Sequence, residues 1–315
     1  MRASTPAVLF LLSLSIGLVG CAVQSAPSSS AEAASAAASQ ADPAFVRAAV
    51  WDDGQAEIAF YQVERTQNQY GRTVAEPQSF LVGTYLVKHD FDPQVQSKVT
   101  QATEHREEAF KYALFYEFES GSYQYKRNYV ANLARADLRP FKESFTSFDW
   151  CSNLYEELAF LPDGQVELLS RSDDYGNTTS TLDYQAGAHP MTSLPVLVRG
   201  LDFSETTTHT FQVLTPDGAY VGATATLEGR ETIEAAGVPT EAERILVTYA
   251  GAAPSLIGER ADTEERYWRA TENERLLVRV EAASGRYRMN LVEHLRSPYW
   301  SENIWGRLAE VQTYP

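Results

Sequence analysis

The chain contains little cysteine and lacks the common local motifs of catalysis and metal binding. Two cysteines occur among 315 residues, and there is no Gly-x-Ser-x-Gly elbow, Walker loop or His-Glu-x-x-His motif. The five histidines are dispersed, with no pair at the spacing of metal ligands. We therefore expect a protein that is not an enzyme and that needs no metal or other cofactor. A hydrolase whose site is assembled from distant residues is the alternative.

Positive charge is also scarce. The formal net charge is −16, and Arg2 is the one charged residue before position 21, so a chain without its first 20 residues carries −17. Nucleic-acid binding requires a basic surface that displaces counterions from phosphates. Because the basic residues form only short pairs such as Lys126-Arg127, this composition excludes nucleic acid as a partner.

Long hydrophobic runs are missing as well. The apolar run at residues 7–19 is too short for a membrane-spanning helix, which needs about 20 residues. Arg2 precedes this run, and Leu18-Val19-Gly20-Cys21 ends it. This order is typical of a cleaved targeting signal, and its last four residues resemble the lipobox of bacterial lipoprotein precursors. The resemblance implies that residues 1–20 are a lipoprotein signal peptide.

The same resemblance makes Cys21 the residue that receives the lipid, and the membrane the partner that this lipid contacts. A chain anchored in this way belongs to the cell envelope outside the cytoplasm. Ala22 follows the cysteine, and the absence of Asp at this position favours the periplasmic face of the outer membrane over the inner membrane. An ordinary secretory signal with an incidental cysteine is the alternative.

The next segment, residues 21–43, consists of the lipidated cysteine and a tether. Residues 22–43 contain nine alanines and six serines, so they can bury little apolar surface, and a flexible coil of this length reaches roughly 25 Å. The remaining residues, 44–315, are expected to form a β-rich periplasmic domain. This domain is either a single unit or two similar halves that divide near residues 173–205.

Lipidation of Cys21 would leave Cys151 without an intramolecular disulfide partner, so the fold must stand without a disulfide. Cys151 follows Trp150 in a stretch with aromatic neighbours, and a free cysteine most often behaves as a small apolar core residue. We therefore predict a buried thiol, with a reactive thiol as the alternative.

From residue 44 onward the apolar residues recur with a period of two, and aromatic and β-branched residues fill these positions. Residues 80–87 and 110–118 are predicted strands, and the Pro-Asp-Gly turns at 161–164 and 215–218 predict hairpins. Helix is expected only near residues 43–51 and 191–200. The predicted fold class is mainly β, with one or more strongly curved antiparallel sheets in an open-barrel or sandwich-like arrangement and one or two short helices.

Alternation over residues 110–118 places Tyr112, Tyr116 and Phe118 on one face of a strand. Such residues most often pack in a core. If the sheet curves into an open barrel, they are candidate ligand-facing aromatics in a concave pocket for an acyl chain or a glycan.

Two resemblances concern the domain itself. The first rests on Trp51-Asp52-Asp53-Gly54-Gln55-Ala56-Glu57, Tyr61, Tyr70-Gly71-Arg72 and Trp150-Cys151. These residues resemble uncharacterised bacterial envelope lipoproteins often labelled septum formation inhibitor Maf. The Ser-Pro-Arg-Arg type motif of the cytoplasmic Maf nucleotide pyrophosphatases does not occur in the chain, so the resemblance implies no pyrophosphatase activity.

The second resemblance covers about 70 residues of the C-terminal half. It rests on Leu227-Glu228-Gly229-Arg230-Glu231-Thr232-Ile233, Ala236-Gly237, Trp268 and Leu277-Val278-Arg279. These residues resemble a family of envelope β-proteins of unknown function with a curved antiparallel sheet. The family implies a fold and no activity.

Together these features predict a membrane-anchored envelope lipoprotein that acts as a non-catalytic binding or structural module. Its partner would be a hydrophobic ligand or another envelope protein. A carrier or chaperone of an acyl ligand is the first alternative, and the hydrolase with a dispersed site is the second.

Overall fold

The computed structural model describes residues 40–67, 73–253, 257, 262–301 and 303–312. The predicted signal peptide, the lipidation site Cys21 and most of the predicted tether lie outside the described residues. Within the described part of the chain, no helix is long and apolar enough to cross a membrane.

In the described residues, sixteen strands form one sheet. The first run along the chain consists of β1 (Ala56–Gln67), β2 (Thr73–Asp92), β3 (Ser97–Lys98), β4 (Glu107–Ser120), β5 (Tyr123–Ala134), β6 (Pro140–Phe148), β7 (Asn153–Phe160), β8 (Gln165–Ser172) and β9 (Gly176–Asp183). The second run consists of β10 (Ala188–Pro190), β11 (Thr208–Leu214), β12 (Tyr220–Ala235), β13 (Val238–Ala253), β14 (Asp262–Ala270), β15 (Leu277–Ala282) and β16 (Tyr287–Ser297).

The pairing of β1 with β16 joins the two runs, so the strand path begins at β10, passes through β16 and β1, and ends at β9. All neighbours pair antiparallel except β10 and β11. Among the described residues β9 and β10 do not pair, and the strongly curved sheet stays open. The chain passes from one edge strand to the other within the predicted dividing segment, residues 173–205. Both halves nevertheless belong to one continuous sheet.

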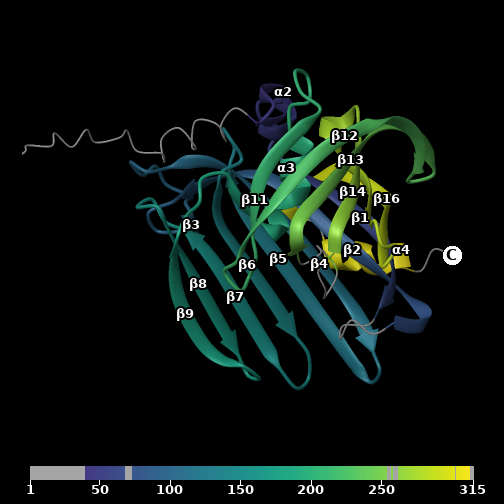
Figure 1. The fold of residues 1–315 in the computed structure, drawn as a ribbon, viewed down its shortest axis with the longest axis horizontal. Helices are drawn as coiled ribbons and strands as arrows, with labels where there is room; N and C mark the ends of the chain where they lie inside the picture. Colours follow the sequence, from purple (N-terminus) through teal and green to yellow (C-terminus); the bar gives the residue numbers. More distant parts are fainter. Residues whose placement is uncertain (1–39, 68–72, 254–256, 258–261, 302, 313–315) are drawn as a thin grey trace, which may run out of the picture.

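The helical segments are short. They are α2 (Pro43–Val46), η1 (Ala49–Asp52), η2 (Met191–Ser193), α3 (Leu194–Gly200), η3 (Asn273–Arg275), η4 (Tyr299–Ser301) and α4 (Ile304–Gln312). Asp42 starts α2, because its carboxylate accepts a hydrogen bond from the backbone N–H of Ala44 at 2.7 Å and Pro43 occupies the first helical position. Figure 1 shows α3 inside the curve of the sheet, and all seven of its residues are buried.

The main hydrophobic core fills the space around α3. Side chains from α2, α3 and strands of both runs meet there, and the Trp51 indole donates a hydrogen bond to the carbonyl of Phe45 at 2.7 Å. A second cluster lies where Ile304 and Val311 of α4 pack against the sheet. Such burial is the main source of stability for a sheet without disulfides.

The predicted fold class and most predicted elements are confirmed. Residues 80–87 lie in β2, residues 110–118 lie in β4, and both predicted helices occur. Gly164 and Gly218 have φ of 86° and 84°, the left-handed conformation that their turns require.

Two features differ from prediction. The structure has a C-terminal helix, α4, that the sequence analysis does not predict. Cys151 is exposed in the turn between β6 and β7, so the predicted buried thiol is wrong. The physical reason is that Asp149 folds this turn past the end of the sheet by accepting a hydrogen bond from the Cys151 backbone N–H at 2.7 Å.

Candidate functional site

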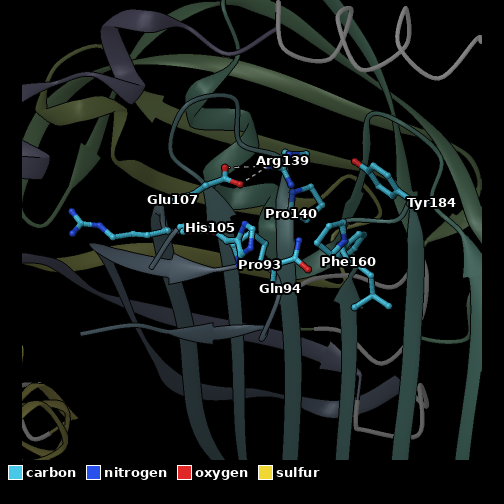
Figure 2. Close-up of a pocket in the computed structure, with 13 residues that line it drawn as sticks. Pro93, Gln94, His105, Glu107, Arg139, Pro140, Phe160 and Tyr184 are labelled. Atoms are coloured by element: carbon cyan, nitrogen blue, oxygen red, sulfur yellow. Dashed lines mark hydrogen bonds and ion pairs between the residues drawn. The ribbon is translucent and has the colours of Figure 1, made fainter. Parts of the chain in front are cut away.

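One candidate site is a cavity of about 540 Å³ at one end of the first run of strands, here called the rim cavity. Turns that are far apart in sequence build it: the β2–β3 turn, the segment leading into β4, the β5–β6 turn, the β7–β8 hairpin and the residue after β9. Figure 2 shows their side chains converging above the strand ends.

Rings and aliphatic groups form one part of the lining, namely Pro93, Pro140, Phe160, Leu161, Pro162 and Tyr184. Polar and charged groups of both signs form the other part, namely Gln94, Glu104, His105, Arg106, Glu107 and Arg139. The cavity is therefore amphipathic, and its charged part is locally balanced within an acidic protein.

Two contacts hold Arg139 in place. Arg139 Nη2 lies 3.1 Å from Glu107 Oε2, and both side chains keep more than two fifths of their surface exposed. The Arg139 guanidinium also lies over the Phe141 ring, 4.8 Å from its centroid. Because this ion pair is open to water, it contributes little to stability, and both groups stay available to a ligand.

Tyr184 and Phe160 form the opposite part of the lining. Their rings meet edge to face at a centroid distance of 5.5 Å, an arrangement that aromatic pairs favour. The Tyr184 hydroxyl donates to the carbonyl of Ala188 at 3.2 Å, and burial raises the pKa of this tyrosine to about 12. At neutral pH this hydroxyl is a hydrogen-bonding group and carries no charge.

The predicted ligand-facing aromatics lie elsewhere. Tyr112 and Tyr116 belong to the main core, with 4% and 0% of their surface exposed, and they line neither the rim cavity nor a second cavity formed by β1, β2, β4, β5 and α4. Phe118 also packs in the core, and it borders the second cavity, of about 590 Å³. The core-packing alternative therefore describes Tyr112 and Tyr116, and a ligand could reach them only if the core opened.

The second cavity is lined mainly by polar side chains that already bind one another. Gln62 donates to Ser79 Oγ at 2.7 Å, and Gln124 donates to Glu117 Oε2 at 3.1 Å. A ligand entering here would have to replace existing hydrogen bonds, which makes this cavity the weaker candidate.

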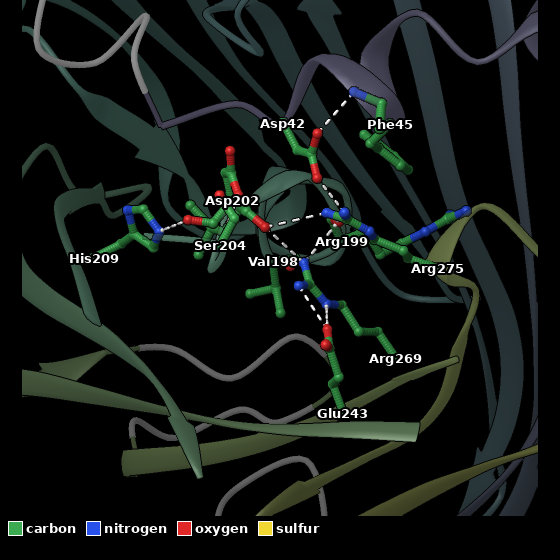
Figure 3. A network of polar contacts seen from close by, with 12 residues as sticks. Asp42, Phe45, Val198, Arg199, Asp202, Ser204, His209, Glu243, Arg269 and Arg275 are labelled. Atoms are coloured by element: carbon green, nitrogen blue, oxygen red, sulfur yellow. Dashed lines mark hydrogen bonds and ion pairs between the residues drawn. The ribbon is translucent and has the colours of Figure 1, made fainter. Parts of the chain in front are cut away.

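A network of buried charges fastens α3 to the sheet (Figure 3). Arg269 donates to the carbonyls of Val198, Arg199 and Leu201 at 2.9 Å each, and it pairs with Glu243 at 2.7 Å. The last carbonyls of a helix lack intrahelical partners and carry partial negative charge. Arg269 satisfies three carbonyls at this end of α3, so its role is structural.

Other buried charged or titratable side chains also bind partners inside the protein. Arg199 and Glu57 form a two-pronged ion pair with N–O distances of 2.8 and 2.7 Å, and each keeps no more than 4% of its surface exposed. Glu265 accepts hydrogen bonds from three tyrosine hydroxyls at 2.6–2.8 Å, those of Tyr249, Tyr267 and Tyr287. Burial raises the pKa of Glu265.

A further buried carboxyl, Glu143 of β6, accepts a hydrogen bond from the backbone N–H of Thr192 at 2.9 Å. Burial raises its pKa from 4.5 to about 7. None of these buried carboxyl groups lines the rim cavity, and the described residues contain no group of three or more His, Cys, Asp and Glu side chains that could hold a metal ion.

Reasoning from the sequence did not identify the rim cavity. The one local signal was the Leu161-Pro162-Asp163-Gly164 turn, which was recognised as a hairpin. This turn lies beside the β2–β3 turn in the structure. The contact between them joins residues 64 positions apart in the sequence, since Gln96 Nε2 donates a hydrogen bond to the carbonyl of Phe160 at 2.9 Å.

No family model matches the chain, and no curated protein matches it. A search of solved structures finds the crystal structure of a β-barrel-like protein of the domain of unknown function DUF1849 from Brucella abortus. The two share 7% identity with a TM-score of 0.45, over 77% of this chain and 98% of that chain. At this level the similarity assigns no residue a role.

Proposed function

We propose that the protein is a lipid-anchored, non-catalytic binding module of the cell envelope, and that the rim cavity binds a short peptide segment of an envelope protein. The observation that carries the proposal is the lining of this cavity, where rings and prolines stand beside charged groups of both signs. Ligand sites commonly combine an apolar wall with a few polar groups that fix orientation.

A peptide fits this lining better than an acyl chain does. A peptide offers apolar side chains to Phe160 and Leu161 and charges of either sign to Glu107 and Arg139. An acyl chain would remove these charged groups from water without replacing their hydrogen bonds, which costs free energy. The acyl-carrier alternative therefore has less support at this cavity.

The anchor is tested separately from the cavity. Cys21→Ser should move the protein from the membrane fraction to the soluble fraction and abolish incorporation of labelled palmitate. Membrane retention of the variant, together with no palmitate in the parent protein, would contradict the anchor.

The cavity is tested by saturation-transfer NMR with two probes. One is a tetrapeptide of lysine, phenylalanine, proline and glutamate, and the other is decanoate. We expect transfer to the peptide and not to decanoate, with loss of transfer in Arg139→Glu. Arg171→Glu is the matched control, because it makes the same charge change at an exposed arginine of β8 outside the cavity. Transfer to decanoate alone would support the acyl-carrier alternative instead.

A further inference from the structure

Three hairpin turns at one end of the sheet carry exposed aromatic side chains. Strands β4 to β9 run alternately up and down, so the β4–β5, β6–β7 and β8–β9 turns lie at the same end (Figure 1). Of the eight large apolar side chains that are exposed in the described residues, four lie in these turns or at the strand ends next to them: Tyr123 (39%), Phe148 (47%), Trp150 (75%) and Tyr175 (86%). We call these four residues the aromatic tips.

The aromatic tips form a row. Every second strand contributes one turn, so neighbouring turns are about 10 Å apart. The rings of Tyr123 and Trp150 bridge two of these turns at a centroid distance of 6.3 Å. The two most exposed large apolar side chains of the described residues, Tyr175 and Trp150, are both in this row. An exposed Trp at a protruding turn leaves apolar surface in water, and such surface commonly marks an interaction site.

The turns that carry the aromatic tips offer no basic side chain to anionic lipid, and Lys126, which stands opposite Phe148 in the register of β5 with β6, pairs with Glu117 at 2.8 Å. The turns, residues 121–122, 149–152 and 173–175, contain no Lys or Arg. Their carboxylates are partly used by the turns themselves, since Asp149 accepts hydrogen bonds from the Cys151 and Ser152 backbone at 2.7 and 3.0 Å, and Asp173 accepts from the Asn153 backbone at 2.9 Å.

We propose that the aromatic tips dock at the headgroup region of a zwitterionic lipid bilayer. Trp and Tyr combine an apolar ring with a polar tip and are enriched at membrane interfaces for that reason. Separate protruding turns can enter a soft bilayer surface independently, whereas a rigid protein partner would need a groove for each turn. The acidic surroundings make neutral lipid the favoured partner.

The lipid anchor and the aromatic tips can contact the same bilayer. This inference rests on the proposed function, which supplies the anchor. Strand β5 runs from the aromatic tips to the entry of the domain, where Arg135 donates to the carbonyl of Val46 in α2 at 2.7 Å. Its 12 residues span about 40 Å. Residues 22–41 can extend over about 65 Å, so the tether is long enough to pass along the domain while the aromatic tips touch the bilayer.

The test uses the chain from residue 21 onward with Cys21→Ser, which leaves Cys151 as the one thiol. An environment-sensitive nitrobenzoxadiazole dye on Cys151 reports docking to vesicles of phosphatidylcholine and phosphatidylethanolamine. We expect a blue shift and increased emission at millimolar lipid, a weaker response when phosphatidylglycerol is added, and partial recovery of that response in salt, because screening reduces repulsion. Since this protein has no lipid anchor, failure of docking and failure of the anchor are distinguished.

Variants locate the docking surface by vesicle sedimentation without the dye. Trp150→Ala and Tyr175→Ala should each lower the vesicle partition coefficient about 5- to 10-fold, and together about 30- to 100-fold. Each substitution removes a ring that would leave water and enter the bilayer on docking. Trp300→Ala is the matched control: Trp300 is 65% exposed but lies just beyond β16, away from the tips, so its loss should change partitioning less than 2-fold.

Three results would overturn the proposal. The first is no dye response at millimolar neutral lipid. The second is a loss in Trp300→Ala as large as that in Trp150→Ala. The third is binding to phosphatidylglycerol vesicles alone. Circular dichroism of each variant confirms the fold, which these exposed substitutions leave intact.

Discussion

Glu143 offers a direct test of how burial controls ionisation inside the sheet. The Glu143→Gln variant keeps an oxygen that can accept the hydrogen bond from the Thr192 N–H, but it cannot ionise. In the parent protein, burial raises the pKa of Glu143 to about 7, and the neighbouring negative charge of Glu156 contributes in the same direction. The two proteins should therefore differ in how their stability depends on pH.

The sign follows from proton linkage. The ordinary pKa of the side chain is 4.5, and the folded value is about 7. Between these values the folded protein keeps a proton that the unfolded chain has lost, so stability falls as pH rises, by about 1.4 kcal/mol per pH unit. The stabilisation is complete below pH 4.5 and is lost above pH 7, a total of about 3 kcal/mol. Glu143→Gln lacks this loss.

The assay is urea unfolding of both proteins at pH 5, 6, 7 and 8. We expect the free energy of unfolding of Glu143→Gln to rise relative to that of the parent by about 2.5 kcal/mol between pH 5 and pH 8. Glu167→Gln is the control, because it removes one negative charge at an exposed position of β8. A constant difference between parent and Glu143→Gln from pH 5 to pH 8 would refute the reasoning, since it would mean that folding does not change the affinity of Glu143 for a proton.

Three further predictions concern single sites. Cys151 should react with a hydrophilic maleimide in the native protein nearly as fast as in guanidinium, and strong native protection would contradict its exposed position. Gly164→Val and Gly218→Val should each lower the free energy of unfolding by about 1–2 kcal/mol in denaturant titrations, because both glycines have positive φ. Arg199→Met should cost about 3–5 kcal/mol, because it leaves Glu57 buried without its partner. Adding Glu57→Gln to Arg199→Met should restore part of the lost free energy of unfolding. No recovery would contradict the ion pair between Arg199 and Glu57.

Local features of the sequence were sufficient to predict the strands and several turns. The alternation at residues 110–118 reflects a strand with one face in the core, and it reads the same whichever strands are its neighbours. The Pro-Asp-Gly turns at Gly164 and Gly218 depend on the conformational freedom of one residue, which is also a local property. The fold class and the hairpins were predictable for this reason.

The position of Cys151 shows where local reasoning fails. Aromatic neighbours such as Phe148 and Trp150 suggested a core, because apolar clusters usually mark buried segments. The register of β6 with β7 ends at Phe148 and Asn153, so the residues between them project beyond the sheet. The exposure of Cys151 depends on where β6 and β7 end. The alternation of apolar and polar side chains does not say where a strand ends.

By itself, then, the sequence determined the β architecture, the main turns and the acidic surface, because each depends on a few neighbouring residues or on composition. Only the tertiary structure decided the strand order, in which β16 pairs with β1, and the positions of the rim cavity and the aromatic tips. Both sites bring together turns separated by tens of residues. Their side chains meet because the sheet aligns strand ends, and no local pattern specifies which ends become neighbours.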